Sequence, residues 1–224
     1  MIEEDLFKIL KEISVGNDRG EKITLVGATK FVPAEKINRA IKAGLDHIGE
    51  NHAQELRDKY DLYLPVYKHF IGRIQKNKLK YIVGKADCID SVDTVEIAEE
   101  ISSKALKLGI TQDIMLEINP SDDEAKGGFP VSGFFEAYEK AKTLAGVRVV
   151  GIMSMLPETD PSSVAKLTSH LRSIYDEIKA KDENIKWLSA GISGDYRTTI
   201  KHGSNMIRLG TAIFGERDYS KVKG

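Results

Sequence analysis

Apolar positions along the chain follow two alternating periods. Eight short runs rich in β-branched and small residues are separated by stretches in which apolar residues recur three and four positions apart. The first pattern is typical of buried strands, and the second is typical of helices that pack on a core. The predicted strands cover residues 23–30, 46–50, 66–72, 86–92, 113–119, 147–155, 185–191 and 206–215.

The predicted helices alternate with these strands. An amphipathic helix opens the chain at about residues 2–14, and others cover 34–44, 51–60, 94–109 and 161–181. Gly44 and Gly109 stand where helix C-terminal caps belong, and Pro33, Pro130 and Pro161 stand near helix starts. The pattern predicts an α/β fold: one domain over residues 1–224, a (β/α)₈ TIM barrel with an extra N-terminal helix. An open doubly wound sheet is the alternative.

Composition narrows the class of protein. The 224 residues are 41% hydrophobic and 30% charged, which indicates a soluble globular protein. The net charge of -1 gives no overall electrostatic attraction to nucleic acid or to a membrane surface. Cys88 is the single cysteine, so no intrachain disulfide forms and a reducing compartment is expected. The acidic N-terminus does not resemble a signal peptide, and the apolar run 147–156 is too short to span a bilayer. We expect a cytoplasmic protein.

Polar residues gather where the predicted strands end, and this is the edge at which barrel enzymes carry their chemistry. They include Lys30, Glu50, Asn51, His69, Asp90, Ser91, Asn119, Lys126, Ser154, Ser193, Arg208 and Thr211.

Lys30 ends the first strand, directly before a predicted helix. One interpretation is a lysine whose stem packs on the barrel rim while its ammonium group reaches water. The other is a Schiff-base lysine, because partial burial favours the neutral amine that attacks an aldehyde or ketone. The position alone leaves both interpretations open.

The last two strand ends favour an anionic ligand. The segment LSAGISGDYRTTI places small residues and Ser193 after the seventh strand, and Gly210 and Thr211 follow the eighth. Loops after strands 7 and 8 often bind phosphate in barrels of this kind. The sequence therefore indicates a ligand with a phosphate at one end and a carbonyl within reach of Lys30.

Several stretches resemble the family of pyridoxal-phosphate-binding homeostasis proteins. They are VGATKFVP, HIGENHAQE, HFIGRIQKNK, INPSDDEAKGGF, GIMSM, AGISGDYRTTI and MIRLGTAIFGERDY, within about residues 20–219. That family has the barrel of the alanine racemase N-terminal domain. HFIGRIQKNK and RLGTAIFGERDY are the most specific stretches, since no barrel as such requires them. Lys76 and Ile192 depart from the residues more usual in the family.

The resemblance implies pyridoxal 5′-phosphate (PLP) as the cofactor. By position, Lys30 matches the lysine that forms a Schiff base with PLP, and Arg208 matches the arginine beside the pyridine nitrogen. The residues implied in binding the phosphate are Ser193, Gly210 and Thr211, and those implied near the cofactor are Asn51 and Met153.

The resemblance also implies a restrained chemistry. An arginine that keeps its proton leaves the pyridine nitrogen neutral, which weakens the cofactor as an electron sink. Racemases with this barrel use a second base from a β domain, and only GERDYSKVKG follows the last predicted strand. The expected function is a non-catalytic, monomeric PLP-binding protein of vitamin B6 homeostasis, with PLP-dependent apoenzymes as candidate partners. The alternatives are an amino-acid racemase and a cofactor-free Schiff-base aldolase.

Other features receive plainer interpretations. The basic stretch 73–85 suits an RNA contact, but a solvated helix face that begins at the pocket rim explains it more simply. The five histidines show no metal-binding spacing, so no metal site is predicted. Trp187 is assigned to packing. Glu50 and Asp195 are expected to be the carboxylates nearest the site, in solvated, helix-capping or acid–base roles.

Overall fold

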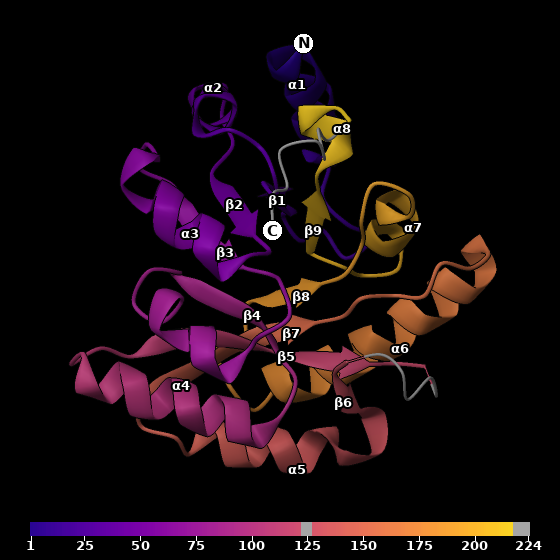
Figure 1. Cartoon of the computed structure of the whole chain (residues 1–224). Coiled ribbons are helices and arrows are strands. Elements are labelled where there is room, and N and C mark those ends of the chain that lie inside the picture. Colours follow the sequence, from indigo (N-terminus) through magenta and orange to yellow (C-terminus); the bar gives the residue numbers. More distant parts are fainter. Residues whose placement is uncertain (122–126, 217–224) are drawn as a thin grey trace.

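A computed structural model describes residues 1–121 and 127–216. Eight parallel strands close into a ring in the order β1-β2-β3-β4-β5-β7-β8-β9, and β1 pairs with β9 to complete it (Figure 1). Their bounds are β1 Thr24–Ala28, β2 His47–Glu50, β3 Tyr67–Phe70, β4 Cys88–Val92, β5 Gln112–Asn119, β7 Val147–Met153, β8 Trp187–Ser189 and β9 Met206–Leu209. The predicted barrel is confirmed. A ninth strand, β6 (Phe129–Pro130), pairs only with the end of β5.

Helices surround the ring and follow the strands in sequence (Figure 1). They are α1 Ile2–Ile13, α2 Ala34–Lys42, α3 Ala53–Lys59, α4 Val95–Lys107, α5 Val131–Lys142, α6 Pro161–Lys179, α7 Tyr196–Lys201 and α8 Thr211–Phe214, with 3-10 helices η1 Tyr60–Leu62 and η2 Lys76–Tyr81. Among the helices of residues 1–121 and 127–216, none has the apolar length that a bilayer span requires.

Local signals explain several helix ends. Asp160 caps α6, because its carboxylate accepts the amide hydrogens of Ser162 and Ser163 at 2.9 and 3.1 Å, and Pro161 occupies the first helical position. Gly44 and Gly109 follow α2 and α4 with φ of 106° and 68°, the left-handed conformation expected after a helix.

The core has an inner and an outer part. Inside the ring lie Val26, Cys88, Met115, Val150, Met153 and Met206. The opposite faces of the strands pack on the helices, so residues such as Ile114 and Leu116 are fully buried outside the ring. Side chains thus alternate between the inside of the ring and the helices, and the carboxyl ends of the strands form the edge at which a barrel of this kind carries its site.

The predicted strand 206–215 is too long. The strand ends at Leu209, and the Gly210 carbonyl accepts the amide hydrogens of Ile213 and Phe214 at 3.0 and 2.9 Å, which winds the chain into α8. Ile213 and Phe214 are buried in the cluster that contains α1 residues. Their apolar character therefore reflects packing of this short helix, which neighbours α1, rather than a longer strand.

Candidate functional site

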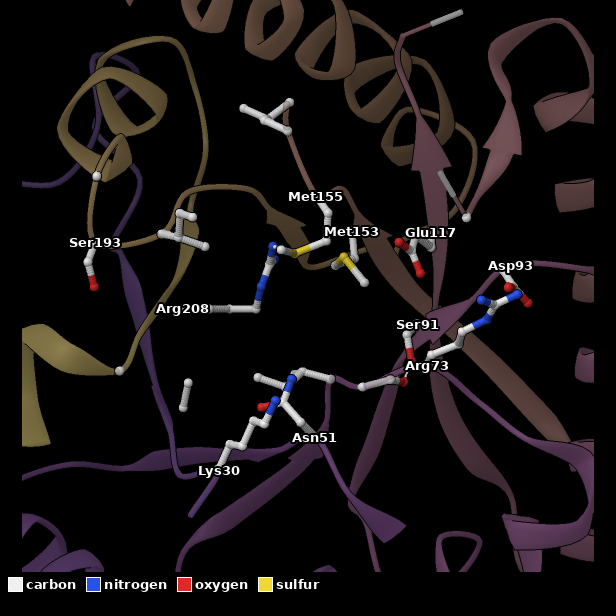
Figure 2. A pocket seen from close by; sticks show the side chains of 18 of the residues that line it. Lys30, Asn51, Arg73, Ser91, Asp93, Glu117, Met153, Met155, Ser193 and Arg208 are labelled. Atoms are coloured by element: carbon white, nitrogen blue, oxygen red, sulfur yellow. Dashed lines mark hydrogen bonds between the residues drawn. The ribbon is translucent and has the colours of Figure 1, made fainter. Parts of the chain in front are cut away.

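One cavity of about 710 Å³ lies at the carboxyl ends of the strands (Figure 2). All seven residues predicted to bind the cofactor line it, namely Lys30, Asn51, Met153, Ser193, Arg208, Gly210 and Thr211. The structure brings these positions together, and their role as cofactor ligands stays a prediction. Lys126, the fifth-strand lysine considered in the sequence, lies outside the described residues.

Lys30 is half-buried and follows the end of β1 at Ala28, in a turn rather than in the strand. Its side chain lines the main cavity and a neighbouring cavity of about 320 Å³. Within the described ranges it forms no ion pair, and its ammonium nitrogen lies 5.0 Å from the centre of the Phe31 ring. An amine in this position faces a cavity without a carboxylate bound to it.

The turn that contains Lys30 has an unusual backbone. The Val32 amide donates to the Thr29 carbonyl at 2.9 Å, and Phe31 has φ of 61°. A side chain at positive φ costs about 1–3 kcal/mol, so surrounding contacts must stabilise it. The Phe31 amide donates to Glu55 Oε2 at 2.9 Å.

Ser193 and Thr211 project from adjacent loops toward the same end of the cavity. Their hydroxyl oxygens lie 3.4 Å apart. The loop that carries Ser193 begins at Gly191, whose φ is 113° and where an added Cβ would lie 2.2 Å from Thr199 Oγ1. Asp195 accepts the Ile192 amide at 2.6 Å and so closes the same loop. Two hydroxyls this close can donate to one oxyanion.

Arg208 rises from β9 into the cavity and is nearly fully buried. Burial lowers the pKa of its guanidinium, and the negative charges of Asp90, Glu117 and Asp195 oppose that shift. An arginine remains protonated under such conditions. The group is therefore a fixed cation and hydrogen-bond donor beside Met155, whose Sδ lies 3.0 Å from Nη2 (Figure 2).

The carboxylates nearest the cavity are not the two that were expected. Asp93 and Glu117 line it, at the side away from Ser193 (Figure 2), and burial raises the pKa of each. Glu50 is 1% exposed and points outward from the ring, where Lys59 Nζ lies 3.0 Å from its Oε1. The expectation of a site carboxylate in a solvated or capping role is therefore wrong for Glu50. The sequence position of Glu50 indicates neither that its side chain is buried nor that Lys59 is its partner.

Below the cavity, the barrel contains a chain of polar side chains. His47 Nδ1 lies 3.0 Å from His69 Nε2, and His69 Nδ1 lies 2.8 Å from Asp90 Oδ1. Burial lowers the pKa of His47 to about 4, and the charge of His69 adds to the shift. Trp187 packs edge-on against His47, with ring centres 6.0 Å apart, as expected for packing.

Sequence spacing did not predict this polar chain, because its members come from separate strands. His69, Cys88 and Asp90 bring possible metal ligands within 4.8 Å of one another, and all three are buried. Burial raises the pKa of the Cys88 thiol, and the negative charge of Asp90 raises it further. Their mutual contacts account for these residues as a hydrogen-bonded interior.

The basic stretch 73–85 divides into two parts. Arg73 lines the main cavity, and Lys78 lines the smaller one. Arg57 and Lys80 lie over the ring of Tyr81, at 4.9 and 5.0 Å from its centre. Arg73, at the start of the stretch, lies at the rim of the site, as predicted. Farther along, Lys80 of η2 and Arg57 of α3 stack on Tyr81.

Comparisons with known proteins agree with this geometry. The family model of the alanine racemase N-terminal domain matches residues 26–218. A pyridoxal phosphate homeostasis protein of Aquifex aeolicus (strain VF5) is 37% identical over 224 residues, covering 96% of this chain and 98% of that protein. The structure of PipY from Synechococcus elongatus PCC7942 with PLP bound has a TM-score of 0.84 at 25% identity, covering 96% of this chain and 100% of that one.

A more distant likeness concerns the fold alone. An alanine racemase of Clostridium difficile 630 is 15% identical with a TM-score of 0.77, covering 98% of this chain and 62% of the racemase. The chain belongs to the family of pyridoxal phosphate homeostasis proteins, which is built on the barrel of the alanine racemase N-terminal domain.

Proposed function

We propose that the protein binds PLP as a Schiff base on Lys30 and takes part in intracellular PLP homeostasis. The observation that carries this proposal is that Lys30 and Ser193 line one cavity from different sides (Figure 2), with the Thr211 hydroxyl 3.4 Å from that of Ser193. PLP needs an amine at its aldehyde and donors at its phosphate. The cavity offers both, and the PLP-bound relative PipY has the same fold.

Each residue has a defined part in this proposal. The Lys30 amine bonds to the aldehyde carbon, and the aldehyde oxygen leaves as water with the two hydrogens of the amine. Ser193 and Thr211 donate to the phosphate, together with backbone at Gly210. Arg208 donates to the ring nitrogen, and Asn51 and Met153 contact the ring.

We propose a non-catalytic role. A protonated Arg208 leaves the pyridine nitrogen neutral, so the bound cofactor withdraws electrons weakly from an attached carbon. The relatives named for homeostasis support this role. The alternative is an amino-acid racemase, which Glu117 favours, because this carboxylate faces the cavity and burial raises its pKa.

Spectroscopy and peptide mapping test the cofactor assignment. Wild-type protein with added PLP should show the absorbance of a Schiff base, and borohydride reduction should place the cofactor on Lys30. Lys30→Ala should lose the band, while the exposed Lys36→Ala should keep it. A colourless wild type that takes up no PLP contradicts the proposal, and a Schiff base formed without PLP on a carbonyl substrate supports the aldolase.

Proton exchange tests the catalytic alternative. Loaded protein in deuterated solvent should not exchange the α-hydrogen of amino acids above the rate of free PLP. Exchange that is fast and depends on Lys30 supports the racemase instead.

The cellular part of the proposal concerns residues 1–224 as one PLP-binding domain. We propose a cytoplasmic monomer that passes PLP to apoenzymes and contacts neither nucleic acid nor membrane. The near-neutral charge supports the expectation of no nucleic-acid or membrane contact, and the single cysteine supports a reducing compartment. Mixing loaded protein with a PLP-dependent apoenzyme should activate the apoenzyme, and sedimentation should give the mass of one chain.

A further inference from the structure

Side chains of a single helix contact the peptide groups on both sides of Lys30. The Phe31 amide, which follows Lys30, donates to Glu55 Oε2 at 2.9 Å. The Thr29 carbonyl, which precedes Lys30, accepts from Lys59 Nζ at 3.4 Å. Glu55 and Lys59 lie one turn apart in α3 and pair with each other at 2.6 Å. One turn of α3 therefore binds the chain immediately before and after Lys30.

The backbone between these contacts does not follow from local preference. Lys30 and Phe31 are the central residues of a turn that the Val32 amide closes on the Thr29 carbonyl at 2.9 Å. Phe31 has φ of 61°, at a turn position that glycine usually occupies. In the described part of the chain it is the only non-glycine residue with positive φ. Tertiary contacts must therefore stabilise the turn, and the hydrogen bond to Glu55 is one of them.

The paired side chains are themselves held in place. Lys59 also contacts Glu50 Oε1 at 3.0 Å, and the Tyr63 hydroxyl donates to the same oxygen at 2.7 Å. Burial alone would raise the pKa of Glu55, but the hydrogen bond and charge of Lys59 and the Phe31 amide outweigh it, and the pKa is lowered. The Glu55 side chain is 19% exposed, so solvent screens this network only in part. Glu55 is thus a fixed, ionised acceptor for the Phe31 amide.

We propose that Glu55, held by Lys59, is a positioning residue that stabilises the left-handed turn at Phe31 and so directs the Lys30 amine into the cavity. Neither Glu55 nor Lys59 lines either cavity in the described ranges, so both act through the turn. The inference rests on the proposed function, because a directed amine matters only if Lys30 bonds to a carbonyl. Fixed orientation of a nucleophile accelerates its attack.

Schiff-base kinetics in the full-length protein test this role. Glu55→Ala removes the acceptor and should slow the appearance of the Schiff-base band with PLP by about tenfold. Glu55→Gln keeps an acceptor oxygen and should slow it less. The exposed Glu35→Gln, with the same loss of charge, should match the wild type. A wild-type rate in Glu55→Ala overturns the inference.

A rescue separates positioning from general stability. Glycine adopts positive φ without penalty, so Phe31→Gly in the Glu55→Ala background should recover most of the lost rate. A helix that is merely destabilised by Glu55→Ala would gain nothing from glycine at position 31. A double variant no faster than Glu55→Ala overturns the inference.

Hydrogen exchange in the cofactor-free protein supplies a measurement that does not depend on PLP. Glu55→Ala should speed exchange of the Phe31 amide at least tenfold relative to amides in β1. If the Phe31 amide exchanges at the wild-type rate in Glu55→Ala, the inference is overturned. If Glu55→Ala fails to fold, Glu55→Gln takes its place, and an unchanged rate in that variant overturns the inference as well. If borohydride reduction of the wild type leaves no PLP on Lys30, the proposed function fails as well. If the wild type carries PLP on Lys30 and the Glu55 variants form the Schiff base at the same rate, only the positioning role fails.

Discussion

The Arg208 guanidinium is bound to Ser189 on the neighbouring strand at two points. Its Nη1 atom donates to the Ser189 carbonyl at 3.0 Å and to the Ser189 hydroxyl at 2.5 Å. The Nη2 atom donates to the Ser154 carbonyl at 2.9 Å. These three oxygens, together with Met155 Sδ at 3.0 Å from Nη2, fix the plane and direction of the cation that faces the cavity.

Replacing Arg208 with lysine should therefore lower the free energy of unfolding. A single ammonium group cannot reach all of these acceptors. The Ser189 carbonyl keeps the Ser154 amide as a donor at 3.0 Å, but a buried Ser154 carbonyl or Ser189 hydroxyl that loses its donor costs about 1–3 kcal/mol. We expect a loss of about 2–4 kcal/mol in urea unfolding. Arg197→Lys, at an exposed position, is the control and should change stability by less than about 1 kcal/mol. Equal midpoints for Arg208→Lys and wild type would contradict this account.

Gly72 should tolerate no side chain. An added Cβ would lie 1.9 Å from the carbonyl oxygen of Asn51, so Gly72→Ala must separate the ends of β2 and β3. We expect PLP affinity to fall more than about tenfold, because Asn51 moves away from the cavity. Gly194 also lines the cavity but has nothing within 4 Å of an added Cβ. Titration of Gly194→Ala should match wild type, and equal affinities for both variants would count against the steric argument.

The Ser193 and Thr211 hydroxyls, which we propose bind the phosphate, should discriminate PLP from pyridoxal. Ser193→Ala and Thr211→Val each remove one donor to a charged group, which is worth roughly 1.5 kcal/mol or about tenfold in affinity. Pyridoxal lacks the phosphate, so its affinity should stay unchanged in both variants. Competition titrations with the two ligands measure the ratio. Equal losses for PLP and pyridoxal would show that the hydroxyls do not bind the phosphate.

The ion pair between Glu21 and Arg172 should make stability depend on acid pH. Burial alone would raise the pKa of Glu21, but hydrogen bonds from Arg172 and Asn17 outweigh it and lower the pKa to about 2 from its ordinary 4.5. The folded state therefore binds this proton less readily than the unfolded state. The stabilisation is complete above about pH 4.5 and disappears as the pH falls to about 2.

The shift corresponds to roughly 3 kcal/mol. Denaturant unfolding at several pH values should show this loss in the wild type. In Glu21→Gln, the free energy of unfolding should fall less steeply between about pH 4.5 and 2, because the contribution of Glu21 is absent. Identical pH profiles for the two proteins would refute the assignment.

The barrel was predictable because its signal is repeated. Each buried strand requires an apolar run, and each outer helix requires an apolar stripe. The same pattern therefore recurs in eight units of the sequence and indicates the barrel. Residues 206–215 were misassigned as strand because Ile213 and Phe214 have strand-like character. Only the contact of α8 with α1 explains their burial.

The lining of the cavity was predictable where a polar residue follows a strand end. Lys30, Ser193 and Thr211 stand at strand ends, and position alone indicated a shared edge. Glu50 could not be assigned, since its partners Lys59 and Tyr63 approach it only in the folded chain. The left-handed Phe31 was equally hidden, because Phe is a residue that local preferences keep out of that conformation.

The pairing of β1 with β9 closes the ring beside the site. Lys30 follows β1, whereas Arg208 lies in β9 and Thr211 begins α8, so two sides of the cavity come from segments separated by nearly the whole chain. A nascent polypeptide has no such cavity until its final strand has docked. Uptake of the cofactor therefore requires that β9 has paired with β1. A bound ligand that contacts both sides of the cavity stabilises this pairing against opening.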